Sequence, residues 1–268
     1  MTENFEKLTP EIISKLVLPK MFCENVEYFE ETSSTNDIAK AMADSGAKEG
    51  TLVIAESQAH GKGRWGRNWE SPKYLGIYVS IILRPKLNKE IIPFISLISG
   101  IATAETIKEE MGLDAKIKWP NDILIREKKV SGILIEGSII QDRLEFLILG
   151  IGINVNNETF KGEYLHTPTS LRIEKDGNII SRKNILERLL VKLEKWYFLL
   201  LKEPDGKETI LKRYKELSHT LGKEVTLRAG KDLLKGTAID IDQMGFLVLK
   251  DKKGKLERIP SGELTNES

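Results

Sequence analysis

The sequence predicts an α+β protein in which a mixed β-sheet with packed helices is followed by a small antiparallel β-barrel. Helical and hairpin-like segments alternate irregularly in the first part of the chain, which favours strands of mixed direction. After Leu221 the pattern changes to short β-rich runs between Gly- and Lys-containing turns, spaced as in a barrel of ~45 residues. We therefore expect two domains, residues 1–220 and residues 221–268.

Helices are predicted where end signals and apolar periodicity agree. Ser34 or Thr35 stands at the start of a helix over residues 37–43. Pro93 opens a longer helix, and Gly112 closes it. Two further amphipathic helices are expected at residues 183–201 and 207–217.

Strands are predicted where apolar or alternating runs lie between turn residues. In the first domain these runs are residues 52–55, 77–83, 117–119, 123–125, 130–136 and 145–155. In the second domain they are residues 224–228, 235–241, 246–250 and 256–259.

Composition excludes several classes of protein. The 268-residue chain carries 41 Lys+Arg against 40 Asp+Glu and is 40% hydrophobic, so it can bury a core but has no charge excess for a dedicated nucleic-acid binder. The single Cys23 cannot form an internal disulfide, and His60, His166 and His219 are too scattered for a zinc cluster, so we expect no metal held by the protein alone. The polar N-terminus is unlike a secretory signal, and no run of ~18 apolar residues predicts a membrane span. These features predict a cytoplasmic protein.

The segment GKGRWGR, residues 61–67, packs three glycines and three cations into seven positions. Glycine lets a backbone approach a ligand closely, and arginine supplies a charged fork suited to phosphate or carboxylate. The segment is neither a Walker loop nor a dinucleotide-binding fingerprint, because its cations stand where those motifs need other residues. It predicts an anion-binding loop, with a solvated basic turn as the alternative.

Two further segments carry polar residues or glycines at strand ends. In KWPND, Pro120 fixes a turn from which Asn121 and Asp122 project, and a hairpin can bring Lys129 beside them. A surface ion pair is the alternative interpretation there. In GIGINV, residues 150–155, glycines inside a strand indicate close approach of a ligand or of a neighbouring strand.

Taken together, these motifs resemble those of the biotin protein ligases. The likeness runs from about Tyr28 to the C-terminus and keeps the family's order and spacing. It rests on Ser34-Thr35-Asn36, Glu56-Ser57-Gln58 leading into GKGRWGR and Trp69, KWPND, KVSGILIE and GIGINVN. The resemblance implies a class II synthetase-like catalytic domain followed by an SH3-like β-barrel.

The resemblance also implies an activity. Such enzymes activate biotin with MgATP to biotinyl-5′-AMP and pyrophosphate, then acylate one lysine of a biotin carboxyl carrier protein such as that of acetyl-CoA carboxylase. The biotin carboxylate must approach the α-phosphorus, and cations must screen the two anions. No protein nucleophile is needed, so catalysis would be positioning and charge stabilisation.

The resemblance assigns roles residue by residue. Catalysis falls to Lys129, which would bridge the biotin carboxylate and the α-phosphate, and to Arg64, which would retain the adenylate. The implied biotin-binding residues are Ser34, Thr35, Asn36, Gln58, Lys62, Gly63, Arg64, Lys129 and Gly132. The implied ATP- and adenylate-binding residues are Gly61, Arg67, Trp69, Lys118, Asn121, Asp122 and Asn154, with no protein metal ligand among them. Trp69 is a candidate to stack on adenine, with a core tryptophan as the alternative.

Two features set this chain apart from other members that it resembles. Lys62 stands where arginine is frequent, and Trp65 stands where a polar residue is usual. Bifunctional members carry a winged helix-turn-helix before this domain, whereas only about 27 residues precede the likeness here, with at most one helix over residues 10–18. We therefore expect a monofunctional member that does not bind DNA or a membrane, and a homodimer, as is common in the family.

Two rival functions remain at this point. A lipoate or octanoate ligase shares the fold and the adenylate chemistry, although GKGRWGR, Trp69 and KWPND favour biotin. A sensor that binds biotin or its adenylate without turnover would lack a catalytic cation, whereas this chain has both Lys129 and Arg64.

Overall fold

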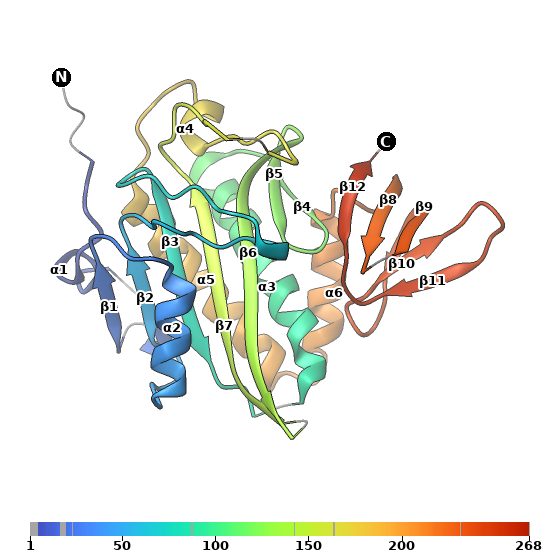
Figure 1. Cartoon of the computed structure of the whole chain (residues 1–268), viewed down its shortest axis with the longest axis horizontal. Coiled ribbons are helices and arrows are strands. Elements are labelled where there is room, and N and C mark those ends of the chain that lie inside the picture. Colours follow the sequence, from blue (N-terminus) through green and yellow to red (C-terminus); the bar gives the residue numbers. More distant parts are fainter. Residues whose placement is uncertain are drawn as a thin grey trace.

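A seven-stranded mixed sheet organises the larger part of the chain (Figure 1). The computed structural model describes residues 5–16, 20–22, 24–86, 88–141, 143–162, 164–230 and 232–267. The strand order is β1-β2-β3-β7-β6-β5-β4, in which β1 and β2 run parallel and every other neighbouring pair is antiparallel. The strands are β1 (Val26–Phe29), β2 (Leu52–Ala55), β3 (Gly76–Leu83), β4 (Ala115–Lys118), β5 (Asp122–Ile125), β6 (Lys128–Ile140) and β7 (Arg143–Asn154).

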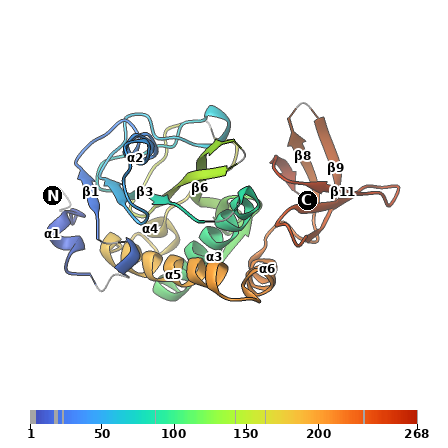
Figure 2. The ribbon, with the colours of Figure 1, turned by 90° about the horizontal axis from the view of Figure 1, so that it is seen from below.

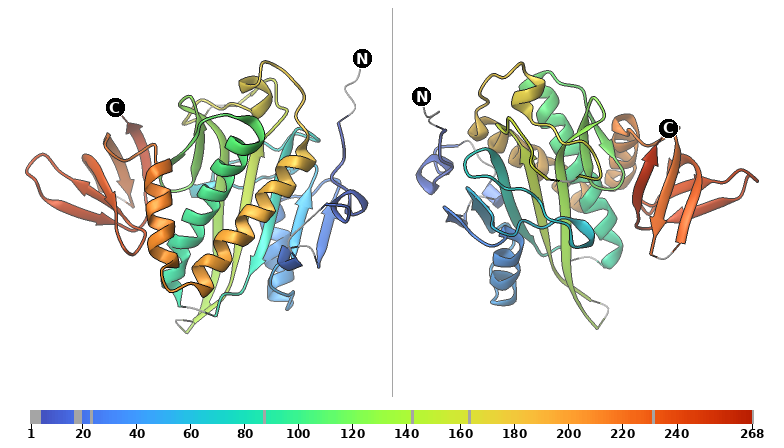
Figure 3. Two further views of the ribbon diagram at one scale, coloured as in Figure 1. Left: turned by 180° about the vertical axis from the view of Figure 1, so that it is seen from behind. Right: turned by 45° about the horizontal axis from the view of Figure 1, so that its top comes forward.

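Helices cover both faces of this sheet unequally. The main helices are α2 (Thr35–Asp44), α3 (Ile92–Met111), α5 (Arg182–Lys202) and α6 (Gly206–Leu217); α1 (Pro10–Ile13), α4 (Leu171–Glu174) and the 3-10 turns η1 (Lys20–Phe22), η2 (Arg64–Gly66) and η3 (Lys89–Ile91) are short. Figure 3 shows α3, α5 and α6 side by side on one face, and α2 lies on the other (Figure 2). The main core lies between the sheet and α3, α5 and α6, and a smaller cluster lies under α2.

A five-stranded antiparallel sheet forms the C-terminal part. Its order is β11-β10-β9-β8-β12, with β8 (Glu224–Ala229), β9 (Asp232–Ile241), β10 (Leu247–Lys250), β11 (Leu256–Ile259) and β12 (Glu263–Glu267). Among the residues described, β11 and β12 do not pair with each other, so this sheet is open along that edge. It stands beside α6 and the edge of the large sheet (Figure 1).

The structure confirms the predicted α+β class, its mixed sheet and its C-terminal β-domain. The long helices end within two residues of their predicted limits, and β2 coincides with its prediction. Two strands were missed, β1 and β12, and the predicted strand over residues 130–136 extends to Ile140. The division at residue 220 stays a proposal, supported by the end of α6 at Leu217 and the start of β8 at Glu224.

The core helix α3 is long and strongly apolar. With η3 it is the one helix among the described residues that is long and apolar enough to cross a membrane. In its most apolar stretch of 18 residues, 78% is buried inside the protein, as is typical of a helix that packs in a core. It packs against α5 and α6 (Figure 3).

A buried ion pair fastens the N-terminal segment to the large sheet. Arg182, the first residue of α5, donates to Glu56 Oε2 at 2.6 Å, and both side chains are at most 2% exposed. The second oxygen of Glu56 accepts from the Leu8 backbone N–H, and Arg182 also donates to the Gly76 carbonyl oxygen at 3.0 Å. Glu56 follows β2 directly, so the pair braces the strand end from which the site loop departs.

Removal of one partner from this pair is expected to destabilise the protein strongly. Glu56→Gln leaves the Arg182 guanidinium buried without its counter-charge, and we expect a loss of about 3 kcal/mol in the free energy of unfolding. Urea unfolding followed by tryptophan fluorescence measures it. The control is Glu257→Gln in the exposed pair with Lys255, where water screens the charges and the loss should be far smaller. Equal losses in the two variants would contradict the role given to burial.

Candidate active site

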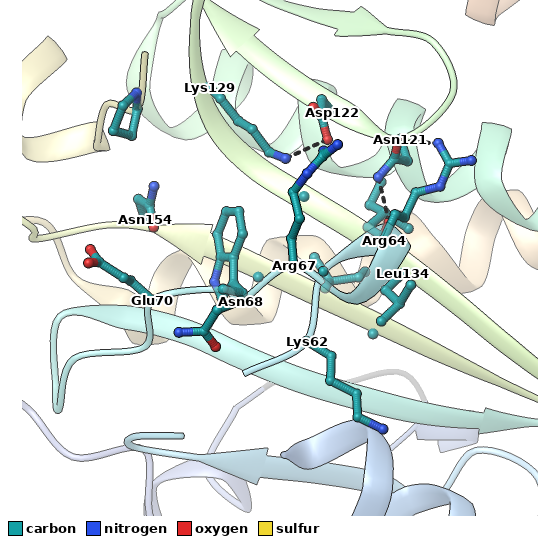
Figure 4. Close-up of a pocket in the computed structure, with 18 of the residues that line it drawn as sticks. Lys62, Arg64, Arg67, Asn68, Glu70, Asn121, Asp122, Lys129, Leu134 and Asn154 are labelled. Carbon is teal, nitrogen blue, oxygen red and sulfur yellow. Dashed lines mark hydrogen bonds and ion pairs between the residues drawn. The ribbon is translucent and has the colours of Figure 1, made fainter. Parts of the chain in front are cut away.

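A cavity of about 320 Å³ opens on the sheet face that carries α2, between the loop over residues 56–75 and the C-terminal sheet. One transverse row of the large sheet forms its floor. Tyr78, Gly152, Gly132, Asp122 and Lys118 are successive cross-strand partners on β3, β7, β6, β5 and β4, and all five line the cavity. Figure 4 shows the charged residues that surround it.

Glycines in this floor make room for side chains from other elements. A Cβ on Gly150 would lie 2.1 Å from Asn36 Oδ1, and a Cβ on Gly152 would lie 2.6 Å from Trp69 Nε1. Gly132, the partner of Gly152, would bring a Cβ to 3.1 Å from the same indole. The register is regular at these positions, so the glycines serve close approach by side chains and mark neither a bulge nor tight packing of strands.

The start of α2 forms a neutral polar wall. The backbone N–H and hydroxyl of Thr35 donate to Gln58 Oε1 at 2.8 and 3.1 Å. Asn36 Nδ2 donates to Glu136 Oε2 at 2.7 Å, and Ser80 Oγ donates to Asn36 Oδ1 at 2.6 Å. Each amide is thereby held in one orientation, which suits recognition of an uncharged group with both donors and acceptors.

Trp69 lies flat on the glycine floor. Its indole Nε1 is buried and has no hydrogen-bond partner among the described residues, so the cavity holds a donor that the protein leaves unsatisfied. Lys129 Nζ lies 5.4 Å from the ring centroid. Trp69 is partly exposed and lines the cavity, so it is not a core tryptophan.

Two cations occupy the middle of the cavity. Lys129 Nζ lies 2.7 Å from Asp122 Oδ1, as the hairpin between β5 and β6 predicts. Arg64 Nη1 donates to Asn121 Oδ1 at 3.1 Å and to the Gly262 carbonyl oxygen at 3.0 Å. Burial lowers the pKa of the Arg64 guanidinium, since removal from water disfavours its charged form, but an arginine keeps its charge in proteins.

The loop over residues 61–69 folds on itself at its base. The Gly61 carbonyl oxygen accepts from Trp69 N at 2.8 Å, and Gly63 N donates to the Arg67 carbonyl oxygen at 2.8 Å. Arg67 forms an ion pair with Glu263 of β12. At the tip, Trp65 takes a left-handed φ of 60° and is 57% exposed.

The structure brings the predicted site residues together. Fifteen of them line the cavity: Ser34, Thr35, Asn36, Gln58, Lys62, Gly63, Arg64, Arg67, Trp69, Lys118, Asn121, Asp122, Lys129, Gly132 and Asn154. Gly61 does not line it, and a Cβ there would lie 2.3 Å from the Trp69 carbonyl oxygen. Asn154 is buried and donates to the Thr169 carbonyl oxygen at 3.0 Å.

Several residues of the site were not predicted from sequence. Ser80 and Glu136 hold Asn36, and Glu263 pairs with Arg67 from the C-terminal sheet. The lone serine inside the apolar run IYVSIIL and the glutamate that ends KVSGILIE were available signals. Other cavity residues outside the prediction include Asn68, Glu70, Phe160, Tyr164, Leu165 and His166.

No group of three or more His, Cys, Asp or Glu within the described ranges is close enough to hold a metal ion. Cys23 lies outside those ranges. Chemically, the cavity can hold an uncharged polar group at the α2 end, anions at Lys129 and Arg64, and a flat ring beside Trp69.

Comparisons with known proteins agree with this arrangement. Residues 28–154 match the biotin/lipoate A/B protein ligase family, and residues 220–264 match the biotin protein ligase C-terminal domain. The chain is 34% identical over 243 residues to the bifunctional ligase/repressor BirA of Bacillus subtilis, covering 90% of this chain and 74% of that protein. The chain belongs to the biotin protein ligase family.

A second relative and a solved structure support the same family assignment. The biotin–[acetyl-CoA-carboxylase] ligase of Mycobacterium tuberculosis is 30% identical, over 88% of this chain and 86% of its own length. The biotin protein ligase of Aquifex aeolicus in complex with biotin and ATP superposes with a TM-score of 0.76 at 30% identity, over 91% of this chain and 100% of that one.

Filling the space at Gly150 should disrupt the polar wall of the ligase. Gly150→Ala forces Asn36 away from Ser80 and Glu136, and we expect the dissociation constant for biotin to rise at least about tenfold. Isothermal titration calorimetry measures it. In a strand with free space the same change would add about 0.5–1 kcal/mol of stability. Unchanged biotin affinity with raised stability would contradict the geometry.

Proposed function

We propose that this ligase joins biotin and ATP into biotinyl-5′-AMP with release of pyrophosphate, and then transfers biotin to one lysine of a biotin carboxyl carrier protein. The observation that carries the proposal is the position of Lys129. Its ammonium lies 5.4 Å from the Trp69 ring centroid and 2.7 Å from Asp122 Oδ1, in the cavity that the neutral wall at α2 also lines, and a carboxylate and a phosphate would meet there.

In the first step a carboxylate oxygen of biotin attacks the α-phosphorus of ATP. A carbon–oxygen–phosphorus anhydride forms, and the bond from the α-phosphorus to the pyrophosphate oxygen breaks. Negative charge grows on the oxygens around phosphorus, and Lys129 stabilises it. The contact with Asp122 at 2.7 Å keeps the lysine directed toward the floor of the cavity before substrates bind.

Biotin binding is assigned to the neutral wall. Ser34, Thr35, Asn36 and Gln58 surround the ureido ring, because their hydroxyls and amides match its donors and its acceptor. Gly63 and Gly132 line the same cavity and are assigned to biotin with these side chains. The four residues of this wall are uncharged, so the charged end of biotin is directed toward Lys129 and Arg64.

ATP binding is assigned to the other end of the cavity. Adenine lies beside Trp69 and Asn154, while Arg67, Lys118, Asn121 and Asp122 face the phosphates and ribose. Mg²⁺ enters with the nucleotide as MgATP, because it prefers substrate phosphates with few carboxylates. When bound, it screens the charge of the departing pyrophosphate.

In the second step the amine of the acceptor lysine attacks the biotinyl carbonyl carbon. An amide bond forms, AMP leaves with the anhydride oxygen, and the amine gives up a proton. Arg64 retains the adenylate until the acceptor arrives.

We propose further that the ligase works in the cytoplasm as a homodimer, and that the carrier domain of acetyl-CoA carboxylase is its acceptor. Of the described residues before β1, only α1 and η1 are helical, and these do not form a helix-turn-helix.

Purified protein incubated with biotin and MgATP, without acceptor, tests the first half-reaction. Native mass spectrometry should show a mass increase equal to biotinyl-AMP. Binding of biotin without adenylation would indicate a sensor, and adenylation of lipoate in place of biotin would indicate a lipoate ligase.

Lys129→Gln should slow adenylate formation severely while the fold remains. The side chain stays polar and is one atom shorter, but it loses the charge that stabilises the transition state, so we expect kcat to fall by about 10²–10³-fold. Pyrophosphate release measures the rate. The control is Lys128→Gln, the exposed neighbour on the same strand, which should retain nearly normal turnover. Near-normal turnover of Lys129→Gln would refute the assignment.

Arg64→Gly should still make adenylate but release it into solution. The variant loses the contacts with Asn121 and Gly262 that place the guanidinium over the cavity. We expect bystander lysines of added serum albumin to become biotinylated, as streptavidin blotting would detect. Arg143→Gly, at the far tip of the β6–β7 hairpin, is the control. Unchanged acceptor selectivity would count against the retention role.

A further inference from the structure

The Lys62 side chain points away from the other cations of the site. Its ammonium forms an ion pair with Asp37 of α2, whereas Arg64 and Arg67 contact Asn121 and the C-terminal sheet. Figure 4 shows Lys62 extending away from Lys129 and Asp122. The Lys62 ammonium donates to Asp37, and this hydrogen bond raises the pKa of Lys62. Glu136 adds to the effect, so the ammonium is charged at neutral pH.

The loop over residues 61–67 is consequently held from two sides. Arg64 and Arg67 fasten it to Gly262 and Glu263. On the side of α2, the side chain of Lys62 attaches the loop to Asp37. A loop that is attached on both sides closes the cavity, whereas a loop attached on one side can swing open.

The ion pair between Lys62 and Asp37 lies next to the neutral wall, in the first turn of α2. Asp37 follows Asn36 directly in the first turn of α2. Glu136 holds the Asn36 amide at 2.7 Å and also faces the Lys62 ammonium. A movement of Lys62 therefore changes the surroundings of Asn36, one of the residues assigned to biotin.

We propose that Asp37 is a positioning residue that holds the loop closed through Lys62, so that Lys62 secures the loop and does not bind biotin with its ammonium. The inference rests on the proposed function. It explains how lysine can replace arginine at this position, because an ion pair with one carboxylate oxygen needs no planar fork. It gives the loop a closing contact that ionic strength weakens, since both side chains are about 40% exposed.

Asp37→Asn and Lys62→Gln test the proposal together. An exposed ion pair is worth about 0.2–1 kcal/mol, so each variant should raise the KM for biotin and the rate of adenylate escape about two- to fivefold, with kcat unchanged. The double variant should be no worse than either single one. Lys62→Arg should behave as wild type. The control is Asp44→Asn, the same change at the opposite end of α2, which should alter neither value.

Charge exchange separates an ion pair from a structural role. Asp37→Lys combined with Lys62→Asp restores opposite charges and should return adenylate retention to within about twofold of wild type. The difference between Asp37→Asn and wild type should shrink in 0.5 M salt. Failure of the exchange, or a defect in Lys62→Gln without one in Asp37→Asn, would overturn the proposal. The second pattern would mean that Lys62 contacts substrate directly.

These results are distinguishable from failure of the proposed function. Wild-type protein that makes no biotinyl-AMP refutes the function itself. Wild-type protein that makes and holds the adenylate, with Asp37→Asn retaining it equally well, refutes the inference alone.

Discussion

The site depends on bare backbone at one face of the large sheet. Gly132, Gly150 and Gly152 lie in the rows where β3, β6 and β7 pair, and their missing side chains admit Asn36 and Trp69. A glycine inside a strand costs about 0.5–1 kcal/mol relative to alanine, so three of them together are a substantial local cost. Packing of the indole and the asparagine on the bare surface offsets it. The remaining wall, floor and loop are arranged around this clearing.

Lys129 and Arg64, two cations that line the cavity, both have partners within the protein. Lys129 faces Asp122, while Arg64 rests on neutral oxygens of Asn121 and Gly262. Cations that are removed from water without partners are costly, so these contacts stabilise the site. Anionic substrates then replace these protein oxygens as partners of the cations, and the cations need little rearrangement. The polar wall at the start of α2 is formed by uncharged side chains, so the cavity has two chemically different ends.

Local signals and long-range register differ in how well the sequence predicts them. Pro93 and Gly112 bound α3 as expected, because end signals act through neighbouring residues. Strand β12, with the sequence ELTNE, lacks an apolar pattern and was missed, since pairing with β8 alone defines it. The same distinction holds in the site. Motifs predicted Lys129 and Asp122, but Ser80 and Glu136 meet Asn36 only through the register of three strands, which no local pattern encodes.

The junction between the loop and the C-terminal sheet has a consequence for the order in which the enzyme matures during synthesis. Arg64 and its partner Gly262 are separated by 198 residues along the chain. A ribosome that adds about 5–20 residues per second needs roughly 10–40 s to make that length. The sheet and its polar wall can form while the nascent chain grows, but the lid over the cavity lacks its outer support until the final sheet emerges. Catalytic competence is therefore acquired late, when the large domain has already folded.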